Sequence, residues 1–585
     1  MSQRFCNRKF ANIFAITFLC ATIALIVHYP SYASKFITTP PILLGKYVSV
    51  TTNTGLLGPT DSAKHPIEIL VEEANAKFQT LKGQSTTFNE AVSEYRRRYN
   101  REPPLGFDHW YDAAIQSNAT LIDNFDTIMD ALEPFWGLSA QELRARVQDL
   151  RELRESKLVS MSIRDQSFTF SNTQHVSANK YQAIIDWVQP YLQFLPDMEL
   201  LFSSLDEARV VVPRDELDNK MRECPGRLSS NNSSSIAQRV PIYFEDLMFQ
   251  RIWMTTTLSC PVGSHARSGI IPPEDDGVHF VRNVTLAKDS CEHPSAMELH
   301  GMYGTKGTAR LLETLHPIFS RSKMSTYQDL LFPASDYAPN DHYKSFDASQ
   351  DTPWEDKSNI LYWAGRTTGA HAKKDSGWRK WQRHRFVKEM NEGDRSVPLL
   401  RQTGGHGSRW EAYEDQMDSL SHLIDVSFTD TIHCDPEECE AMRKELHFNE
   451  EKQPAEAAYN NRFVMDIDGN AFTERFYRLL MSKSTVFKMT MFQEWHDDRL
   501  IPWVHYVPIS LKMTELPETI RFLAETEKGQ EIAKNIAEQG SEWALKVLRN
   551  EDMGLAVFRT LLEYGRLYGE ERDRTGECPW NRKID

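Results

Sequence analysis

The pattern of apolar and polar positions divides the chain into a helical first part and a later part in which short apolar runs alternate with helices. In 88–99, apolar positions such as Phe88 and Tyr95 recur at helical spacing, and a proline pair ends this helix before another begins. A further helix is predicted at 67–81, and the highly charged residues 120–160 also have a helical pattern. The first part of the chain is therefore predicted to be helical.

Beyond about residue 180 the pattern favours an α/β sheet. The apolar runs MELLF and ARVVV are separated by a turn that contains Asp206, and short apolar strands between helices are typical of this class. Further strands or strand–turn–helix units are predicted at 358–365, 463–488 and 503–509, and helices at 516–568. This layout predicts two α/β lobes followed by closing helices.

Composition agrees with a large folded protein. The chain has 585 residues, 40% hydrophobic and 11% aromatic, so two or three domains with substantial cores are expected. Its formal net charge of −15 argues against a general nucleic-acid binder, so no nucleic-acid partner is expected. Local basic patches can still bind small anions.

The N-terminal pattern predicts a membrane anchor. Residues 10–27 are apolar or small and uncharged, and Arg4, Arg8 and Lys9 precede them, which is typical of a single-pass type II protein with a lumenal body. A cleaved signal peptide, with SYAS at 31–34 as its cleavage site, is the alternative. We expect a cytosolic tail, a signal anchor and a stem over residues 1–9, 10–28 and 29–85.

Other signals favour a lumenal body. N-glycosylation motifs begin at Asn118, Asn231, Asn232 and Asn283. Six cysteines follow the anchor, an even number that predicts disulfides in an oxidising compartment: Cys224, Cys260, Cys291, Cys434, Cys439 and Cys578. Cys434 and Cys439 could close a short loop, and a zinc site there is a poor alternative because no second close pair is nearby. The ending NRKID is not a KDEL-type signal, so the Golgi membrane is favoured, with the endoplasmic reticulum second.

The first candidate site is basic. Residues 363–387, WAGRTTGAHAKKDSGWRKWQRHRFV, carry seven Lys or Arg beside a glycine-rich turn. Backbone N–H groups at a strand–turn–helix junction favour phosphate, and Arg366 and the cations after it can add charge-assisted hydrogen bonds. The alternative is a solvated basic helix.

The second and third candidates are acidic. Asp466 and Asp468 form a DxD pair that could hold a divalent metal, or they are two turn aspartates that cap the next helix. On that helix, Arg475 or Arg478 could face a diphosphate in place of a metal. Asp206, just past a strand, could take a proton from a hydroxyl. Alternatively it is an ordinary turn residue or a partner of Arg209, with Asp197 and Glu199 as rivals; glycoside-hydrolase carboxylates also stay open because no spacing defines them.

Several stretches together resemble glycosyltransferase family 90. LPDMELLFSSLDEARVV at 195–211 is similar to a segment of the protein O-glucosyltransferases, and LYWAGRTTG at 361–369 is similar to the donor turn of the fungal capsule-associated branch. Residues 466–488, followed by RLIPWVHYVPI at 499–509, resemble the region from the family's arginine-bearing helix to its PWVHY motif. The resemblance covers roughly residues 86–570.

This resemblance implies an α/β fold of the GT-B type, with two Rossmann-like lobes around the active site and closing C-terminal helices. It also implies a UDP-sugar donor carrying glucose or xylose, inversion at the anomeric carbon, and no metal requirement. Asp206 matches the family's base aspartate, Arg475 its donor-phosphate arginine, and the donor turn falls on Gly365, Arg366, Thr367 and Thr368. Asp468, Arg478 and His505 are secondary candidates. The expected parts are a helical region, an acceptor-side lobe, a UDP-sugar lobe and closing helices at 86–180, 181–350, 351–515 and 516–585.

One departure from the family matters. Its turn arginine is replaced by Ala364, which weakens diphosphate binding unless Arg366 substitutes, and we expect that substitution to need a bend in the turn. Lys483 also stands where the family often has glycine. The expected function is transfer of a sugar to a hydroxyl of a glycan or glycoprotein. The alternatives are a catalytically inactive lumenal binding protein and a metal-dependent transferase that uses Asp466 and Asp468.

Overall fold

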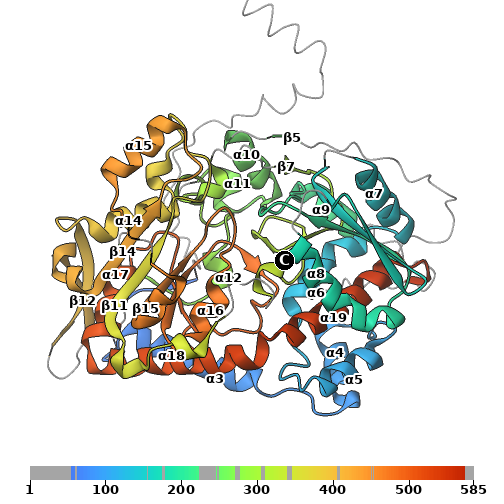
Figure 1. Cartoon of the computed structure of the whole chain (residues 1–585), viewed down its shortest axis with the longest axis horizontal. Coiled ribbons are helices and arrows are strands. Elements are labelled where there is room, and N and C mark those ends of the chain that lie inside the picture. The colour runs from blue at the N-terminus through green and yellow to red at the C-terminus, as the bar shows by residue number, and fades with distance from the viewer. Residues whose placement is uncertain are drawn as a thin grey trace, which may run out of the picture. The chain divides into compact units, whose positions relative to one another are not determined.

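The structure, a computed structural model, has a mixed α/β fold (Figure 1). It describes residues 55–59, 62–153, 156–173, 178–222, 245–246, 249–270, 277–304, 310–338, 346–404, 409–449, 451 and 453–572. Within Thr54–Asp585 the chain forms one compact unit. The tail, the anchor, residues 29–54 of the predicted stem, Asn231, Asn232, Cys224 and Cys578 lie outside the described residues, so the predictions about them stay predictions.

The predicted N-terminal helices are present. They are α3 (Pro66–Leu81), α4 (Phe88–Tyr99), α5 (Phe107–Gln116), α6 (Asp126–Leu132) and α7 (Ala140–Glu152). The start of α4 is fixed by a capping box, because the Thr87 hydroxyl accepts from the Glu90 N–H and the Glu90 carboxylate accepts from the Thr87 N–H. Its buried residues, Ala91 and Tyr95, are one turn apart, as the helical spacing predicts.

The first sheet is mixed. Its strand order is β10 (Leu330–Leu331), β8 (Ile318–Ser320), β4 (Met198–Ser203), β2 (Leu158–Arg164) and β3 (Ser167–Ser171). The strands β10, β8 and β4 run parallel, whereas β2 pairs antiparallel with both β4 and β3. The predicted strand at 208–212 is wrong: Val210 makes only an isolated bridge to Leu312. The sheet also begins before residue 181, where the acceptor-side lobe was predicted to start.

The second sheet is entirely parallel. Its order is β14 (Ile424–Asp430), β11 (Ser358–Arg366), β15 (Asn461–Ile467), β16 (Thr485–Met489) and β18 (Val507–Pro508). Strands β15 and β16 are buried almost throughout, which is why they read as continuous apolar runs. Of the strand predicted at 503–509, only the two residues of β18 form a strand. The helices α14 (Gln382–Asn391) and α16 (Phe476–Met481) follow β11 and β15 in the chain.

Smaller elements complete the fold. An antiparallel hairpin that we did not predict joins β12 (Ser396–Thr403) to β13 (Arg409–Gln416). The remaining helices of more than one turn are α8 (Ala178–Val188), α9 (Arg214–Arg222), α10 (Phe249–Ser259) and α15 (Pro436–Glu445). The shortest elements are β1 (Leu56–Leu57), β5 (Glu245–Asp246), β6 (Phe280–Val281), β7 (Arg310–Leu311), β9 (Ser322–Lys323), β17 (Gln493–Glu494), α11 (His265–Ser268), α12 (Val284–Ala287) and α13 (Ala296–Leu299).

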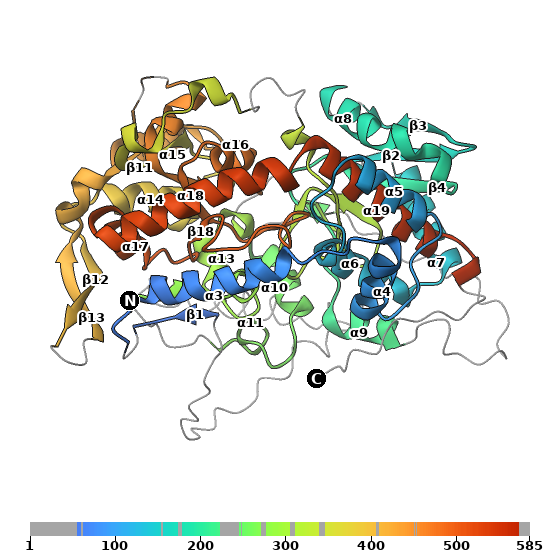
Figure 2. The same ribbon diagram turned by 90° about the horizontal axis from the view of Figure 1, so that it is seen from below.

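The closing helices connect the two sheets. They are α17 (Leu516–Glu525), α18 (Glu527–Val547) and α19 (Asn550–Tyr568), as predicted. Helix α18 packs on α16 and β16 of the second sheet, and α19 packs on α5, α7 and α8 beside the first (Figures 1 and 2). The hydroxyl of Tyr564 donates to the carbonyl of Glu199 on β4 at 3.1 Å. The C-terminal helices therefore hold both sheets in one unit.

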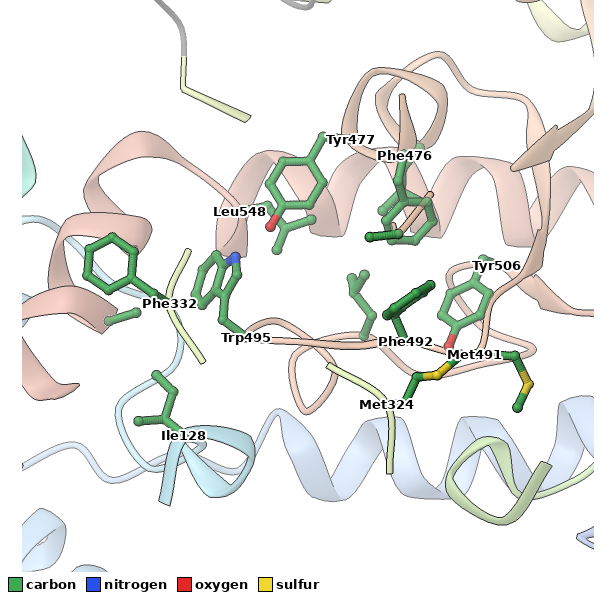
Figure 3. Packing of buried hydrophobic residues seen from close by; sticks show 14 of the residues in the cluster. Ile128, Met324, Phe332, Phe476, Tyr477, Met491, Phe492, Trp495, Tyr506 and Leu548 are labelled. Carbon is green, nitrogen blue, oxygen red and sulfur yellow. The ribbon is translucent and has the colours of Figure 1, made fainter. Parts of the chain in front are cut away.

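The largest apolar cluster joins elements of both sheets. Figure 3 shows Ile128 of α6, Met324 after β9, Phe332 after β10, Phe476 of α16 and Trp495 after β17, all within this cluster. Trp495 is 1% exposed. Burying a large apolar side chain contributes about 1.5–3 kcal/mol, so a core shared by both halves resists their separation.

Among the described residues there are two disulfides, Cys260–Cys291 and Cys434–Cys439, and the second is the short loop that the spacing predicts. In the part of the chain that the structure describes, no helix is both long and apolar enough to cross a bilayer. The predicted anchor lies outside that part.

Candidate functional site

A cleft of about 560 Å³ opens at the carboxyl ends of strands from both sheets. Asp206 lies three residues after β4, Arg321 follows β8 directly, and Gly365 and Arg366 end β11; all four line the cleft. Strands of α/β sheets present their carboxyl ends to ligands because the connecting loops leave a crevice there. The cleft is therefore the expected place for a ligand.

Residues predicted from separate stretches meet in this cleft. Asp206, Gly365, Arg366, Thr368 and Arg475 all line it, together with Ala364 and Arg478. This is the juxtaposition that a base aspartate and a donor arginine require. The chemical role of each residue stays a prediction.

The donor turn divides its side chains between the cleft and the interior. Thr367 is buried, and its hydroxyl donates to the Ile432 carbonyl at 3.0 Å and accepts from the Ile432 N–H at 2.9 Å. Its side chain therefore holds the turn and does not line the cleft. Arg366 is exposed and lines the cleft together with Ala364, and the pairing register of β11 shifts between Gly365 and Arg366. The expectation that Arg366 substitutes for the missing arginine with a bend in the turn stays a prediction.

Arg475 is the N-cap residue of α16 and reaches across the end of β11. Its Nη1 donates to the Ala364 carbonyl at 2.9 Å, and its guanidinium lies 5.5 Å from the ring centre of Trp363. Burial, and next the charge of Arg478, lower the pKa of Arg475. The charge of Arg478 beside Arg475, which is partly removed from water, is unfavourable unless an anion lies between the two guanidinium groups.

A third guanidinium, Arg383, makes this excess of positive charge larger. Its Nη1 donates to the Arg366 carbonyl at 3.1 Å and to the Thr368 hydroxyl, and its Nε donates to the Asp468 carbonyl at 2.9 Å. Burial and then Arg475 lower the pKa of Arg383 to about 9. Nη1 of Arg478 is buried without a hydrogen-bond partner among the described residues. Together these groups form a pocket suited to an anion of more than one charge.

Arg383 comes from the basic stretch at 363–387, but most other cations of that stretch lie elsewhere. Arg379 pairs with Glu445, Lys380 pairs with Glu298, and Arg385 donates to the carbonyls of Leu511 and Lys512. The alternative of a solvated basic surface therefore holds for much of the stretch. Sequence reasoning did not single out Arg383, although its place in a basic segment after the donor turn was a usable signal.

The aspartates of the DxD pair do not line the cleft. Asp466 is 1% exposed and accepts from Lys488 Nζ at 2.9 Å and from the Thr473 hydroxyl. Asp468, also 1% exposed, lies 3.2 Å from His300 Nε2 and accepts from the Met491 N–H at 2.8 Å. Both are buried partners of other side chains, and the N-cap residue of α16 is Arg475. The interpretation as aspartates that cap this helix is therefore wrong. No cluster of metal-ligating side chains occurs within the described ranges.

His505, the other secondary candidate, belongs to the core. Its Nδ1 accepts from the Ile501 N–H at 2.8 Å, and its ring stacks on Trp543 with centres 5.6 Å apart. Burial lowers the pKa of His505 to about 3. It does not line the cleft.

The rivals of Asp206 are accounted for by other contacts. Asp197 accepts from the Asp165 N–H at 3.0 Å, and Glu199 pairs with Arg164 at 2.9 Å. Neither lines the cleft. The partner of Asp206 is not Arg209, as one interpretation had it, but Arg321, whose Nη2 donates to Asp206 Oδ1 at 2.7 Å. No local sequence pattern connects Arg321 with Asp206, because the two residues lie 115 positions apart along the chain.

The part of the chain that forms most of the cleft is similar to a known protein family. Residues 304–574 match the family model described as glycosyl transferase family 90, which confirms the resemblance predicted from sequence over that region. Except for Asp206, the cleft residues named above fall within the matched region.

The relatives carry related names. An O-glucosyltransferase rumi homolog of Aedes aegypti is 26% identical over 278 residues, 44% of this chain and 58% of that protein. Its counterpart in Anopheles gambiae is 27% identical over 279 residues, with the same coverage of 44% and 58%. Protein O-glucosyltransferase 1 of Bos taurus is 29% identical over 108 residues, 18% of this chain and 26% of that protein. The chain thus spans little more than half the length of the curated relatives it matches.

Proposed function

We propose that this protein is an inverting glycosyltransferase that moves a sugar, glucose or xylose, from a UDP-sugar to a hydroxyl of a glycan or glycoprotein. The observation that carries the proposal is one cleft with guanidinium groups on one wall and an aspartate on the other. The family match and the names of the relatives support glycosyl transfer. We propose further that the two sheets form the Rossmann-like lobes of a GT-B arrangement.

In this proposal the diphosphate of the donor binds the arginine wall. Burial and then the charge of Arg475 lower the pKa of Arg383, and burial and then the charge of Arg478 lower the pKa of Arg475. A pyrophosphate supplies the missing negative charge and accepts several charge-assisted hydrogen bonds. Arg366, which lines the same cleft as Ala364, takes the place of the family's turn arginine. Gly365 allows the donor to approach the backbone closely.

Transfer then needs one proton acceptor and one leaving group. Asp206 accepts the proton of the acceptor hydroxyl, and the oxygen attacks the anomeric carbon as the bond to UDP breaks. Attack from the face opposite UDP inverts the anomeric centre. The charge that develops on the leaving diphosphate is stabilised by the guanidinium groups already in place. The arginines can thus fill the role of a metal, and Asp466 and Asp468 are engaged with Lys488 and His300.

One observation favours a second candidate. Ala364 removes a cation that the family places on the donor turn, so a catalytically inactive lumenal protein that binds sugar nucleotides or glycans is the alternative. Such a protein would keep the arginine wall without a productive position for the acceptor.

Replacing Asp206 by Asn tests the proposal. The variant should lose transfer from UDP-glucose or UDP-xylose to an acceptor by at least about 100-fold, because general base catalysis contributes roughly 10²–10⁴. Its calorimetric Kd for UDP should stay near that of the wild type. A fully active Asn variant would refute the role of Asp206. A wild type that binds UDP but transfers no sugar would favour the inactive alternative.

We propose the Golgi membrane as the location, with a single-pass type II anchor, and the endoplasmic reticulum as the second choice. The support is the sequence pattern at the N-terminus and the two disulfides.

A further inference from the structure

Three alternating charges, Asp336, Arg321 and Asp206, line the acceptor side of the cleft, and the mechanism above uses only the last of them. Lys180 Nζ lies 2.9 Å from Asp336 Oδ1. Arg321 Nη1 donates to Asp336 Oδ2 at 2.7 Å, and Arg321 Nη2 donates to Asp206 Oδ1 at 2.7 Å. Lys180, Asp336, Arg321 and Asp206 therefore form one continuous chain of ion pairs.

Arg321 is fixed firmly within this chain. Its side chain is only 13% exposed, it also donates to the Leu205 carbonyl at 3.1 Å, and its guanidinium lies 5.8 Å from the ring centre of Phe472. Burial works against its charge, but Asp336 and then Asp206 outweigh burial and raise the pKa of Arg321. Burial of Asp336 is likewise outweighed, by Arg321 and Lys180, and the pKa of Asp336 is lowered. Arg321 therefore stays positively charged, and Asp336 holds it through Nη1, the nitrogen that does not contact Asp206.

Asp206 is held differently at its two oxygens. Oδ1 accepts the hydrogen bond of Arg321, whereas Oδ2 takes no part in that pair and the side chain is 52% exposed. A carboxylate bound at one oxygen has a defined orientation, and its second oxygen can accept a proton from a ligand in the cleft. The side chains that line the cleft around this carboxylate are Arg321 and Asp336 on its own wall and Arg366, Glu474 and Arg475 on the other.

We propose that Arg321 is a positioning residue for the transfer reaction: held by Asp336, it orients Asp206 so that Oδ2 faces the acceptor hydroxyl. This inference rests on the proposed function. The proton leaves the acceptor hydroxyl for Oδ2 while the bond from oxygen to the anomeric carbon forms and the bond to UDP breaks. Asp206 returns the proton to solvent after the products leave.

A split between kcat and the Kd for UDP separates this role from a merely structural one. In Arg321→Gln, kcat should fall about 10-fold to 100-fold while the Kd for UDP stays near that of the wild type, since the base is no longer oriented. In Asp336→Asn, kcat should fall less, because Arg321 keeps its bond to Asp206 and loses only its anchor.

Arg379→Gln is the matched control, because Arg379 is a surface arginine that pairs with Glu445 outside the cleft; it should leave kcat and the Kd for UDP unchanged. Thermal melting shows whether each variant is folded. If Arg321→Gln does not fold, Arg321→Lys decides: it should lower kcat while the Kd for UDP stays unchanged.

An unchanged kcat in the folded Arg321 variant, or a fall in kcat matched by an equal loss of UDP affinity, with Asp206→Asn inactive, would overturn this inference and leave the proposed function standing. A wild type without transfer, or an active Asp206→Asn, would overturn both.

Discussion

At the scale of single residues, the donor end of the cleft depends on the missing side chain of Gly365. A Cβ atom there would lie 2.6 Å from Cζ2 of Trp363 and 2.8 Å from Nη2 of Arg475. Both distances are far shorter than real contacts allow, so either the ring or the guanidinium would have to move. Glycine at this position is what lets Arg475 lie across the strand and bond to the Ala364 carbonyl.

Gly365→Ala should therefore weaken UDP binding about tenfold, because a displaced guanidinium loses a charge-assisted hydrogen bond worth roughly 1.5–3 kcal/mol. The free energy of unfolding should fall by about 1–3 kcal/mol as the buried Trp363 is crowded. Calorimetry with UDP and chemical denaturation measure the two effects. Gly263→Ala is the control, since a Cβ there meets nothing within 4 Å. Equal UDP affinity in Gly365→Ala and the wild type would contradict this account of the donor turn.

At the scale of elements, a loop closed by a disulfide supports the donor turn on the side away from the cleft. The segment before α15 pairs with the turn, because the Ala372 N–H donates to the His433 carbonyl at 2.7 Å and the Asp435 N–H donates to the Ala372 carbonyl at 2.9 Å. The Cys434–Cys439 bond closes this segment onto α15. The turn thus has a covalently closed support that does not touch the cleft itself.

Removing this disulfide should lower affinity as well as stability. Replacing Cys434 and Cys439 by Ser should lower the free energy of unfolding by about 2 kcal/mol, as expected for a short closed loop, and raise the Kd for UDP several-fold. Replacing Cys260 and Cys291 is the control: its longer loop should cost about 4 kcal/mol and leave the Kd unchanged. The same Kd in both double variants would show that the loop does not support the turn.

The elements also show which parts of the fold the sequence could predict. The positions of β11, β15 and the closing helices could be predicted, because buried parallel strands and amphipathic helices have strong local sequence patterns. The predicted strand at 208–212 was wrong because an apolar run indicates that residues are buried. It does not indicate that they pair with a neighbouring strand. The partners Arg321 and Asp336 could not be found, since their contact with Asp206 joins segments far apart in the chain.

At the scale of the whole molecule, several buried histidines make the folded state sensitive to acid. Burial lowers the pKa of His316, His384 and His505 to about 3 each. An unfolded histidine takes up a proton below its usual value of about 6.5, and a buried neutral one does not, so stability is lost as the pH falls below that value. Burial raises the pKa of Glu494 to about 8 and of Asp498 to about 7, which acts in the opposite direction near neutral pH.

His384→Phe isolates one part of this dependence. Both ring nitrogens of His384 are buried without a hydrogen-bond partner in the described part of the chain, and the ring lies against Trp378, Trp381 and Phe428. Between pH 7 and pH 5 the wild type should lose about 2 kcal/mol more of its free energy of unfolding than the variant does. Urea denaturation of both proteins at the two pH values measures this difference. Parallel losses would mean that His384 does not stay neutral in the fold.

The most direct test of the central claim is an experimental structure of the chain with UDP bound. The diphosphate should lie within hydrogen-bond distance of Arg475, with Asp206 facing it from the opposite wall of the same cleft. A diphosphate bound elsewhere, or one in this cleft that makes no contact with Arg475, Arg383 or Arg366, would contradict the account.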